Sequence, residues 1–183
     1  TSGAELSEHP DRLVLPGVGA FGSGMAEMRA RGLDAFVRRF ADTGRPLLGI
    51  CVGAQMLFDV GEEFGEHDGL GLISGRVRRV AEAMPDGRNH RIPHIGWSPL
   101  VLPAARPTWS GSPLSGLREG ASVYFVHSYA PEPSQESDRL ADTYYDGVRI
   151  CAAVGRGNVW GCQFHPERSA EAGLDVVSAF LAL

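Results

Sequence analysis

Lysine is absent from this chain, and all 17 of its basic residues are arginines. Its absence excludes a lysine general base and a lysine Schiff base from any reaction that the protein carries out. The formal net charge is −5, so nothing in the composition indicates a nucleic-acid partner or an anionic membrane surface. No apolar run reaches the length of a membrane-spanning helix, and we expect no membrane association.

Cysteine is scarce as well. An odd count without framework spacing predicts a reduced, cytoplasmic chain. His90 and His94 are four residues apart, but Pro93 disfavours a helix between them and no third ligand completes a zinc set. We therefore expect no metal and no cofactor. The length suits one domain, which we expect over residues 1–183. The three cysteines are Cys51, Cys151 and Cys162.

The first half of the chain alternates between strand and helix patterns. Residues 13–15 form a short apolar run that ends at the turn Pro16-Gly17-Val18-Gly19. Residues 21–40 have helical periodicity, which Gly32 is placed to interrupt. A second apolar run, residues 47–50, precedes a helical pattern that begins at Gln55. This alternation predicts an α/β fold with a central, mostly parallel sheet flanked by helices.

After residue 70 the pattern changes to shorter strands separated by turns. Asp146-Gly147 and Arg156-Gly157-Asn158 are hairpin signals, and they predict an antiparallel section of the sheet. Residues 103–120 are rich in proline, glycine and serine and read as a surface loop. The chain ends in a predicted helix from about residue 170, with Leu174, Val177 and Leu181 on one side. Strands are expected at residues 70–77, 88–97, 122–129, 139–145, 148–154 and 158–164.

Cys51 follows the second apolar run, in the pattern Gly49-x-Cys51-x-Gly53. A strand, a sharp turn and a helix in this order form a nucleophile elbow, where flanking glycines avoid clashes beside the nucleophile. The turn holds the sulfur above the sheet, and the N-terminus of the next helix favours a thiolate. The competing interpretation is a buried structural cysteine.

His165 and Glu167 provide the base and the orienting group that a cysteine nucleophile needs. Both belong to the short segment Phe164-His165-Pro166-Glu167, at the end of a predicted strand. His165 would accept the Cys51 proton and pass it to a leaving amine, and Glu167 would hold the imidazole in one tautomer. Taken without the elbow, the segment has an alternative interpretation, in which a solvated histidine and a solvated glutamate lie in a turn.

Backbone donors for an oxyanion are available in two places. The Val52 N–H follows the nucleophile directly, and the segment Gly17-Val18-Gly19 lies at the end of a neighbouring strand. His127-Ser128-Tyr129 follows another apolar run, and its polar groups suit ligand binding or simply a polar strand edge.

With these residues in place, the chain resembles the class I glutamine amidotransferases, which share a Cys–His–Glu triad. Within that class it is similar to the family of glutaminase subunits of imidazole glycerol phosphate synthase. The Pro-Gly-Val-Gly segment is the sharper signal, because sister amidotransferases usually have Pro-Gly-Gly or Pro-Gly-Pro there. The matching segments are Leu15-Pro16-Gly17-Val18-Gly19-Ala20-Phe21-Gly22, Gly49-Ile50-Cys51-Val52-Gly53-x-Gln55, Gly69-Leu70-Gly71-Leu72-Ile73, Pro93-His94-Ile95-Gly96-Trp97, Tyr124-Phe125-Val126-His127-Ser128-Tyr129 and Gln163-Phe164-His165-Pro166-Glu167-Arg168-Ser169.

The resemblance implies a flavodoxin-like fold and a role for each motif residue. It implies Cys51 as nucleophile, His165 as base and Glu167 as its orienter. It also implies hydrolysis of the L-glutamine side-chain amide through a thioester, with ammonia passing to a (β/α)₈-barrel cyclase subunit in a heterodimer. That partner would use the ammonia to make imidazole glycerol phosphate and an aminoimidazole carboxamide ribotide for histidine biosynthesis. The implied glutamine pocket is lined by Gly53, Gln55, His127, Ser128 and Tyr129.

Two departures from the family pattern leave alternatives open. The family begins with a strand, a helix and a second strand before the Pro-Gly-Val-Gly strand, whereas only twelve polar residues precede that strand here. We expect that first unit to be missing or truncated. Ala54 replaces a larger apolar residue, a change we expect to be harmless. Alternative functions are an amidotransferase subunit for a cyclase-like partner in sugar-nucleotide biosynthesis, and a catalytically silent partner-binding module.

Overall fold

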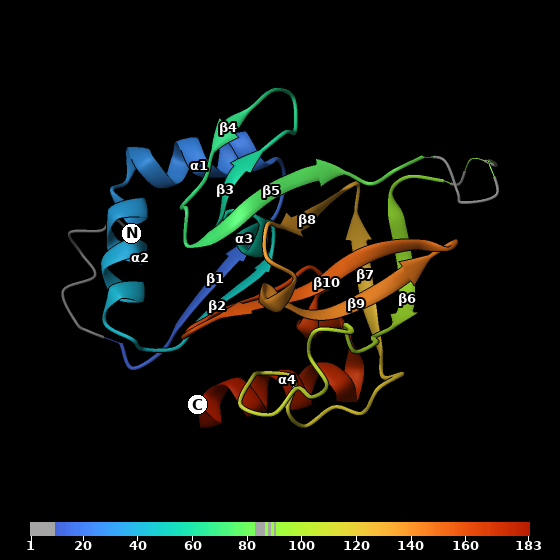
Figure 1. The fold of residues 1–183 in the computed structure, drawn as a ribbon. Coiled ribbons are helices and arrows are strands. Elements are labelled where there is room, and N and C mark those ends of the chain that lie inside the picture. Colours follow the sequence, from blue (N-terminus) through green and yellow to red (C-terminus); the bar gives the residue numbers. More distant parts are fainter. Residues whose placement is uncertain (1–9, 83–86, 88, 90) are drawn as a thin grey trace.

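A five-stranded mixed sheet runs through the middle of the computed structural model, which describes residues 10–82, 87, 89 and 91–183 (Figure 1). Three neighbouring strands, β1 (Leu13–Gly17), β2 (Leu47–Cys51) and β11 (Val159–Cys162), are parallel. The sheet continues antiparallel through β10 (Val148–Arg156) to β9 (Arg139–Tyr145). The structure thus has the parallel and antiparallel sections that the sequence predicts.

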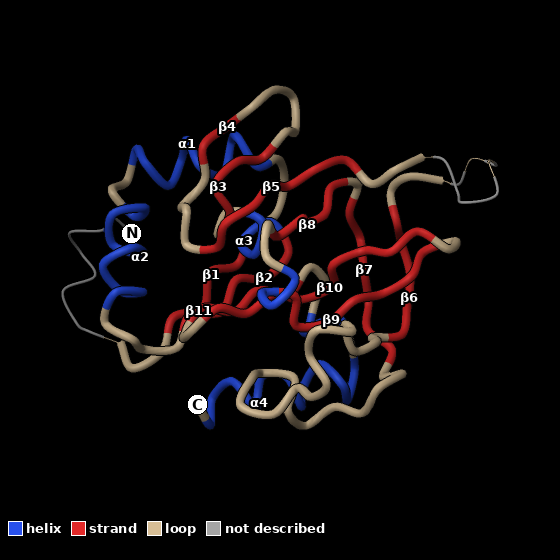
Figure 2. Tube along the Cα trace, in the orientation of Figure 1, coloured by secondary structure: helices blue, strands red, loops and turns tan. Residues whose placement is uncertain are grey.

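Two smaller sheets accompany the central one. Figure 2 shows the β9–β10 hairpin extending toward the β6–β7 pair, and Val101 joins β9 through a bridge to Asp142. Asp146 and Gly147 both have positive φ at the tip of this hairpin, as its sequence predicts. One sheet has the order β4 (His67–Asp68), β3 (Phe58–Gly61), β5 (Ile73–Arg79) and β8 (Tyr129–Pro133), and the other pairs β6 (His94–Pro99) with β7 (Ser122–His127).

The helices cover opposite sides of the central sheet (Figure 1). The pattern over residues 21–40 forms two helices, α1 (Phe21–Ala30) and α2 (Leu33–Asp42), and the predicted break falls at Gly32 with φ 66°. They pack on one face of the sheet. Alternate residues of β2 point to the two faces, so Leu47 contacts this first core and Leu48 contacts the second.

The second core lies beneath the C-terminal helix α4 (Ala170–Ala182). The sequence grouped Leu174, Val177 and Leu181 on one side of this helix, and they are the exposed side. The helix instead buries Val176 and Phe180, because Gly173 brings its backbone against the Pro166 carbonyl.

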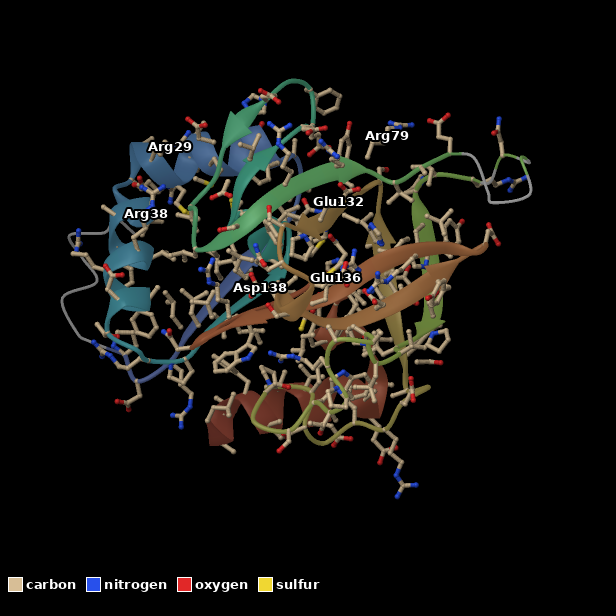
Figure 3. All side chains as sticks on the ribbon, viewed as in Figure 1. Arg29, Arg38, Arg79, Glu132, Glu136 and Asp138 are labelled. Carbon is tan, nitrogen blue, oxygen red and sulfur yellow. The ribbon has the colours of Figure 1, made fainter. Side chains whose placement is uncertain are left out.

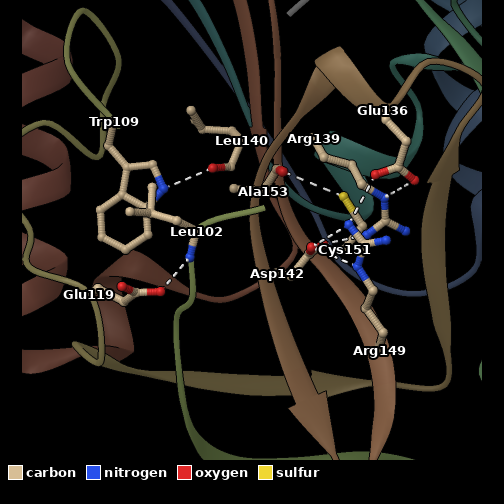
Figure 4. A network of polar contacts seen from close by, with 10 residues as sticks. All are labelled: Leu102, Trp109, Glu119, Glu136, Arg139, Leu140, Asp142, Arg149, Cys151 and Ala153. Carbon is tan, nitrogen blue, oxygen red and sulfur yellow. Dashed lines mark hydrogen bonds and ion pairs between the residues drawn. The ribbon is translucent and has the colours of Figure 1, made fainter. Parts of the chain in front are cut away.

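The segment 103–120 is only partly the surface loop that its composition predicts. Trp109 is 5% exposed and Leu114 is fully buried, and both pack with Trp160 in the second core. The Trp109 indole Nε1–H donates to the Leu140 carbonyl of β9 over 2.8 Å (Figure 4). A single buried aromatic therefore attaches this loop to the edge of the sheet.

The prediction of a helix that begins at Gln55 is wrong. A four-residue helix, α3 (Val52–Gln55), ends at Gln55, and the chain continues as β3. The backbone N–H groups of residues 69–73 donate to the carbonyls of Met56, Leu57, Phe58 and Asp59. In a continuing helix those carbonyls would accept hydrogen bonds from N–H groups within the helix. Here the N–H groups of residues 69–73 bind them instead, so the helix does not continue.

Several predicted strands have different limits in the structure; those expected at 148–154 and 158–164 are β10 and β11. The strand expected at 122–129 is divided at Ser128 between β7 and β8, which belong to different sheets. The strand expected at 70–77 is β5, which begins at Ile73. Of the strand expected at 88–97, residues 88 and 90 lie outside the described residues, and β6 begins at His94.

Arginines attach the first helices to the segment that follows the elbow. Arg29 of α1 and Arg38 of α2 are labelled in Figure 3. Arg29 donates to the Asp68 carbonyl, and Arg38 donates to the Gly69 and Leu70 carbonyls, over 2.7 to 3.0 Å. These bonds attach α1 and α2 to residues 68–70, which return along β3. Among the described residues, no helix is both long and apolar enough to cross a membrane.

Candidate active site

Cys51 lies at the end of β2, directly before α3. Its backbone has φ 54° and ψ −114°, a conformation that non-glycine residues seldom adopt. The side chain is 6% exposed. This strained turn between strand and helix is the local geometry of a nucleophile elbow, although the helix has only four residues.

The two glycines around Cys51 are required by close backbone packing. A Cβ on Gly53 would lie 1.9 Å from the Leu15 carbonyl oxygen, and one on Gly49 would lie 2.7 Å from the Ala54 Cα. A Cβ on Gly17 would lie 2.5 Å from the Gly53 nitrogen. The elbow therefore rests directly on β1, and Gly17 is paired with Cys51 in the parallel ladder.

The environment of the sulfur favours the neutral thiol. Burial raises the pKa of the Cys51 thiol to about 11, and the Glu167 charge adds to the rise, while a hydrogen bond from the Val52 backbone N–H opposes it. The sequence-based expectation that the helix N-terminus favours a thiolate is outweighed here by burial and by the shortness of α3. The thiol therefore needs a base to become a nucleophile.

His165 and Glu167 are hydrogen-bonded to each other at the start of a 3₁₀ turn, Pro166–Arg168. The His165 Nδ1 lies 2.7 Å from the Glu167 Oε1. A carboxylate accepts only, so Nδ1 carries the proton and the neutral ring has its lone pair on Nε2. This Nε2 is buried and has no hydrogen-bond partner among the described residues. It is thus available to accept a proton.

A pocket of about 460 Å³ opens above the elbow. It brings together two groups of the predicted site residues, those of the elbow and those of the His127–Tyr129 segment. Glu167 lies behind His165, and Gly17 and Gly53 pack beneath the elbow, so these three do not line the pocket. The lining residues are Val18, Gly19, Cys51, Val52, Gln55, Glu63, Pro93, Val126, His127, Ser128, Tyr129, His165 and Arg168.

The His127 side chain lines this pocket and is uncharged. Burial, together with the charges of His94 and His165, lowers its pKa to about 3. Its Nδ1 donates to the Tyr129 carbonyl over 3.0 Å, and its Nε2 lies 3.0 Å from the His94 Nδ1. The His94 Nε2 lies 2.9 Å from the Ser98 hydroxyl, which completes a buried chain of fixed tautomers.

Several residues in the pocket or beside Cys51 were not singled out from the sequence. Glu63 and Arg168 supply opposite charges to the lining. Gln163 is 1% exposed, and its Nε2 lies 3.9 Å from the Cys51 Sγ. The position of Gln163, two residues before His165 at the end of a strand, was an available signal, since such residues share a face. Glu63 belongs to a run of acidic residues, from which no single member stands out.

A metal centre has no support in the part of the chain that the structure describes. Within it, no group of three or more histidine, cysteine, aspartate or glutamate side chains is arranged to hold a metal ion. His90 lies outside the described residues.

Comparison with known proteins gives the same class as this geometry. The family model "Glutamine amidotransferase class-I" matches residues 2–181. The structure is similar to that of PurLQS from Thermotoga maritima, with a TM-score of 0.68 and 20% identity over 94% of this chain and 79% of that one. The glutaminase domain of CTPS from Trypanosoma brucei has a TM-score of 0.56 and 16% identity over 94% of this chain and 71% of that one. These two likenesses show the fold.

Curated relatives are closer in sequence. The imidazole glycerol phosphate synthase subunit HisH 1 of Legionella pneumophila (strain Lens) is 47% identical over 173 residues, which are 94% of this chain and 81% of that protein. The HisH subunit of Geobacillus thermodenitrificans (strain NG80-2) is 44% identical over 171 residues, 93% of this chain and 77% of that protein. The fold and the pocket thus define a class I glutamine amidotransferase. Within that class, the chain belongs to the HisH family of imidazole glycerol phosphate synthase subunits.

Proposed function

We propose that this protein is the glutaminase subunit of an imidazole glycerol phosphate synthase in histidine biosynthesis, with Cys51, His165 and Glu167 as its catalytic triad. The observation that carries the proposal is the His165 ring. The Glu167 carboxylate, 2.7 Å from Nδ1, fixes the tautomer of the ring, and its Nε2 has no hydrogen-bond partner among the described residues. His165 lines the same pocket as Cys51. A base with this arrangement beside a protonated thiol is what thiol catalysis requires.

The reaction follows from these positions. The His165 Nε2 takes the proton of the Cys51 thiol, and the sulfur attacks the side-chain amide carbon of glutamine. The resulting imidazolium, which Glu167 stabilises, gives its proton to the leaving nitrogen, and ammonia departs. A water molecule, deprotonated by the same Nε2, then hydrolyses the thioester to release glutamate and free Cys51.

The oxyanion of each tetrahedral intermediate needs backbone donors at the elbow. The Val52 N–H is the first, since it already reaches the Cys51 sulfur. The segment Gly17-Val18-Gly19 supplies the second. Val18 and Gly19 line the pocket, and Gly19 has φ 89°. Because glycine lacks a Cβ, the peptides on either side of Gly19 can adopt orientations that other residues disfavour.

The polar groups of the pocket match the two ends of an amino acid substrate. Glu63 offers a carboxylate for the α-ammonium group and Arg168 a guanidinium for the α-carboxylate. Gln55, Ser128 and Tyr129 line the same pocket, and neutral His127 lines it without adding charge. Gly53 acts from below, where it keeps the elbow against β1.

We further propose that the partner is a cyclase subunit of (β/α)₈-barrel fold, which docks over the mouth of the pocket. The face of the β6–β7 ribbon exposes Ile95, Trp97 and Val126. Val126 also lines the pocket, so this apolar face continues from its rim. A partner seated here would receive ammonia where it forms. The three cysteines are free thiols, which supports a cytoplasmic site of action.

Glutamine hydrolysis with and without the cyclase tests the proposal. The Cys51→Ala variant should lose glutamine hydrolysis while the complex still makes product from added ammonia, because the cyclase chemistry resides in the partner. Turnover of glutamine near the wild-type rate in Cys51→Ala protein would contradict the triad. Failure of a histidine-pathway cyclase to bind the wild-type chain would contradict the assigned pathway.

A further inference from the structure

Gln163 has a side chain that reaches the proposed nucleophile. It follows β11, and its backbone N–H donates to the Ala152 carbonyl of β10 over 2.9 Å. This bond attaches the residue to the central sheet. Its amide Nε2 lies 3.9 Å from the Cys51 Sγ, within the range of a hydrogen bond to sulfur. The side chain is 1% exposed, so water does not compete for the contact.

The orientation of the Gln163 amide is fixed by a second glutamine. The Gln55 Nε2 lies 2.9 Å from the Tyr129 carbonyl oxygen and 2.9 Å from the Gln163 Oε1. A backbone carbonyl only accepts, so Gln55 must present its NH₂ group there. The same NH₂ group donates to the Gln163 Oε1. The NH₂ group of Gln163 is therefore the end that faces the sulfur.

A donor at this place has a chemical consequence. Burial disfavours the charged form of the Cys51 sulfur, and the Val52 N–H is one group that counteracts it. A hydrogen bond to a charged acceptor is stronger than one to a neutral acceptor, so a second donor favours the thiolate over the thiol. No hydrogen bond joins Cys51 to His165 among the described contacts, so the amide contact does not depend on the base.

We propose that Gln163 is a further catalytic residue whose side-chain amide donates to the Cys51 sulfur and stabilises the attacking thiolate. Gln55 is then a positioning residue, because it holds that amide with its donor toward the sulfur. Gln55 also lines the pocket beside Tyr129, so the donor is coupled to the wall that contacts substrate. This inference rests on the proposed role of Cys51 as nucleophile.

The experiment measures thiolate formation directly, without glutamine. Iodoacetamide reacts with the thiolate, so its rate of reaction with Cys51 across pH reports the thiol pKa. The wild type is compared with Gln163→Met, which removes the donor without adding a charge. It is also compared with Gln163→Glu, which keeps the shape and the acceptor for Gln55 but replaces the donor by a carboxylate, whose charge adds its own rise to the thiol pKa. Peptide mass spectrometry locates the label, and Cys51→Ala gives the background from Cys151 and Cys162.

Loss of the donor should raise the thiol pKa by about one unit or more, as expected for a charged hydrogen bond. The remaining thiolate is intrinsically more nucleophilic, so alkylation at neutral pH should slow roughly three- to tenfold. Gln55→Met should produce a smaller change in the same direction, because it releases the amide from its fixed orientation. Gln135→Met, at an exposed glutamine, is the control and should match the wild type.

Two results would overturn the proposal. Gln163→Glu and Gln163→Met could keep the wild-type pH profile of alkylation, or they could raise only the KM for glutamine with that profile unchanged. The second result would limit Gln163 to a role in glutamine binding. Thermal unfolding of each variant identifies the variants that fold. If Gln163→Met does not fold, Gln163→Glu, which conserves the shape of the side chain, is the variant that is measured. Failure of glutamine hydrolysis in the wild type would contradict the proposed function, while the alkylation profile would still be measurable.

Discussion

The catalytic proposal depends on which nitrogen of each imidazole ring carries the proton. In His165 the Glu167 carboxylate holds the proton on Nδ1, which leaves Nε2 as the base. General-base assistance is worth about 10²–10⁴-fold in rate. We therefore expect His165→Ala to lower kcat for glutamine by at least that range. Glu167→Gln should lower kcat less, because an amide can still contact the ring but does not stabilise the imidazolium.

Steady-state assays of both variants in the presence of the cyclase check this order. Arg149→Gln, which changes an ion pair on β10 with Asp142 and Glu136 (Figure 4), serves as a control for loss of a charged hydrogen bond away from the pocket. A Glu167→Gln protein as active as the wild type would reduce Glu167 to a structural role.

His127 provides a prediction about pH and stability. Its pKa is about 3 in the folded protein, against about 6.5 for an unfolded histidine. Below pH 6.5 the unfolded chain binds a proton that the folded chain does not, so stability falls as the pH falls from about 6.5 toward 3. At pH 5 this proton binding lowers the free energy of unfolding by about 2 kcal/mol, since one pKa unit is about 1.4 kcal/mol.

Urea unfolding at pH 6.5 and pH 5 measures this loss, and the wild type is compared with His127→Gln. The variant should lose less stability between the two pH values, because it has no proton to bind at this position. An identical pH dependence in both proteins would show that His127 is charged in the folded state or that another group dominates. His94 and His165 face His127 and remain in both proteins.

At the scale of elements, the contact between β1 and the elbow leaves no room for a side chain at Gly53. A Cβ at Gly53 would lie 1.9 Å from the Leu15 carbonyl oxygen, and its next neighbours are also backbone atoms of β1. Gly53→Ala should therefore destabilise the protein by about 1–3 kcal/mol or more, and should displace Cys51. The measurements are the urea midpoint and the alkylation rate of Cys51. Gly116→Ala is the matched control, because its nearest neighbour would lie 3.7 Å away, and it should unfold at the wild-type midpoint.

The elements show what the sequence alone could predict. The elbow and the His165–Glu167 pair were predictable, because each depends on residues two or three positions apart. The contact between Gln55 and Gln163 joins residues 108 positions apart, and nothing local in either segment indicates it. The strand β3 was assigned to a helix, since its apolar residues are buried in either conformation. Only the return of residues 69–73 decides between them.

The C-terminal helix illustrates a second limit. Its sequence has two apolar faces, one with Leu174 and Leu181 and another with Val176 and Phe180. Periodicity does not tell them apart. The packing of Gly173 on the Pro166 carbonyl turns the second face toward the sheet. A close backbone approach of this kind depends on an element that precedes the helix, so it is visible only in three dimensions.

For the whole molecule, the exposed face of the β6–β7 ribbon is the proposed contact with the cyclase. Trp97 lies opposite Tyr124 in the ladder, and Arg168 of the pocket lies over the Tyr124 ring. A tryptophan at the centre of an interface commonly contributes about 2 kcal/mol or more to binding. Trp97→Ala should therefore weaken cyclase binding about thirtyfold, with little change in the stability of the isolated subunit because the side chain is exposed.

Calorimetric titration of the cyclase into wild-type and Trp97→Ala protein gives the two dissociation constants. Tyr144→Ala removes an aromatic residue of the same exposure, 54%, from β9 and should bind like the wild type. Equal weakening by both variants would place the partner elsewhere or over a wider area than the ribbon.

The three tryptophans of this chain are distributed unequally between interior and surface. Trp109 and Trp160 are 5% and 8% exposed in the core beneath α4, whereas Trp97 is 54% exposed on the ribbon. A collisional quencher in solution therefore reaches the Trp97 fluorescence and hardly that of the other two. Docking of the cyclase over the ribbon would reduce the fraction of tryptophan fluorescence that the quencher reaches. Unfolding would increase that fraction. One emission spectrum recorded with quencher can thus distinguish assembly from denaturation without any attached label.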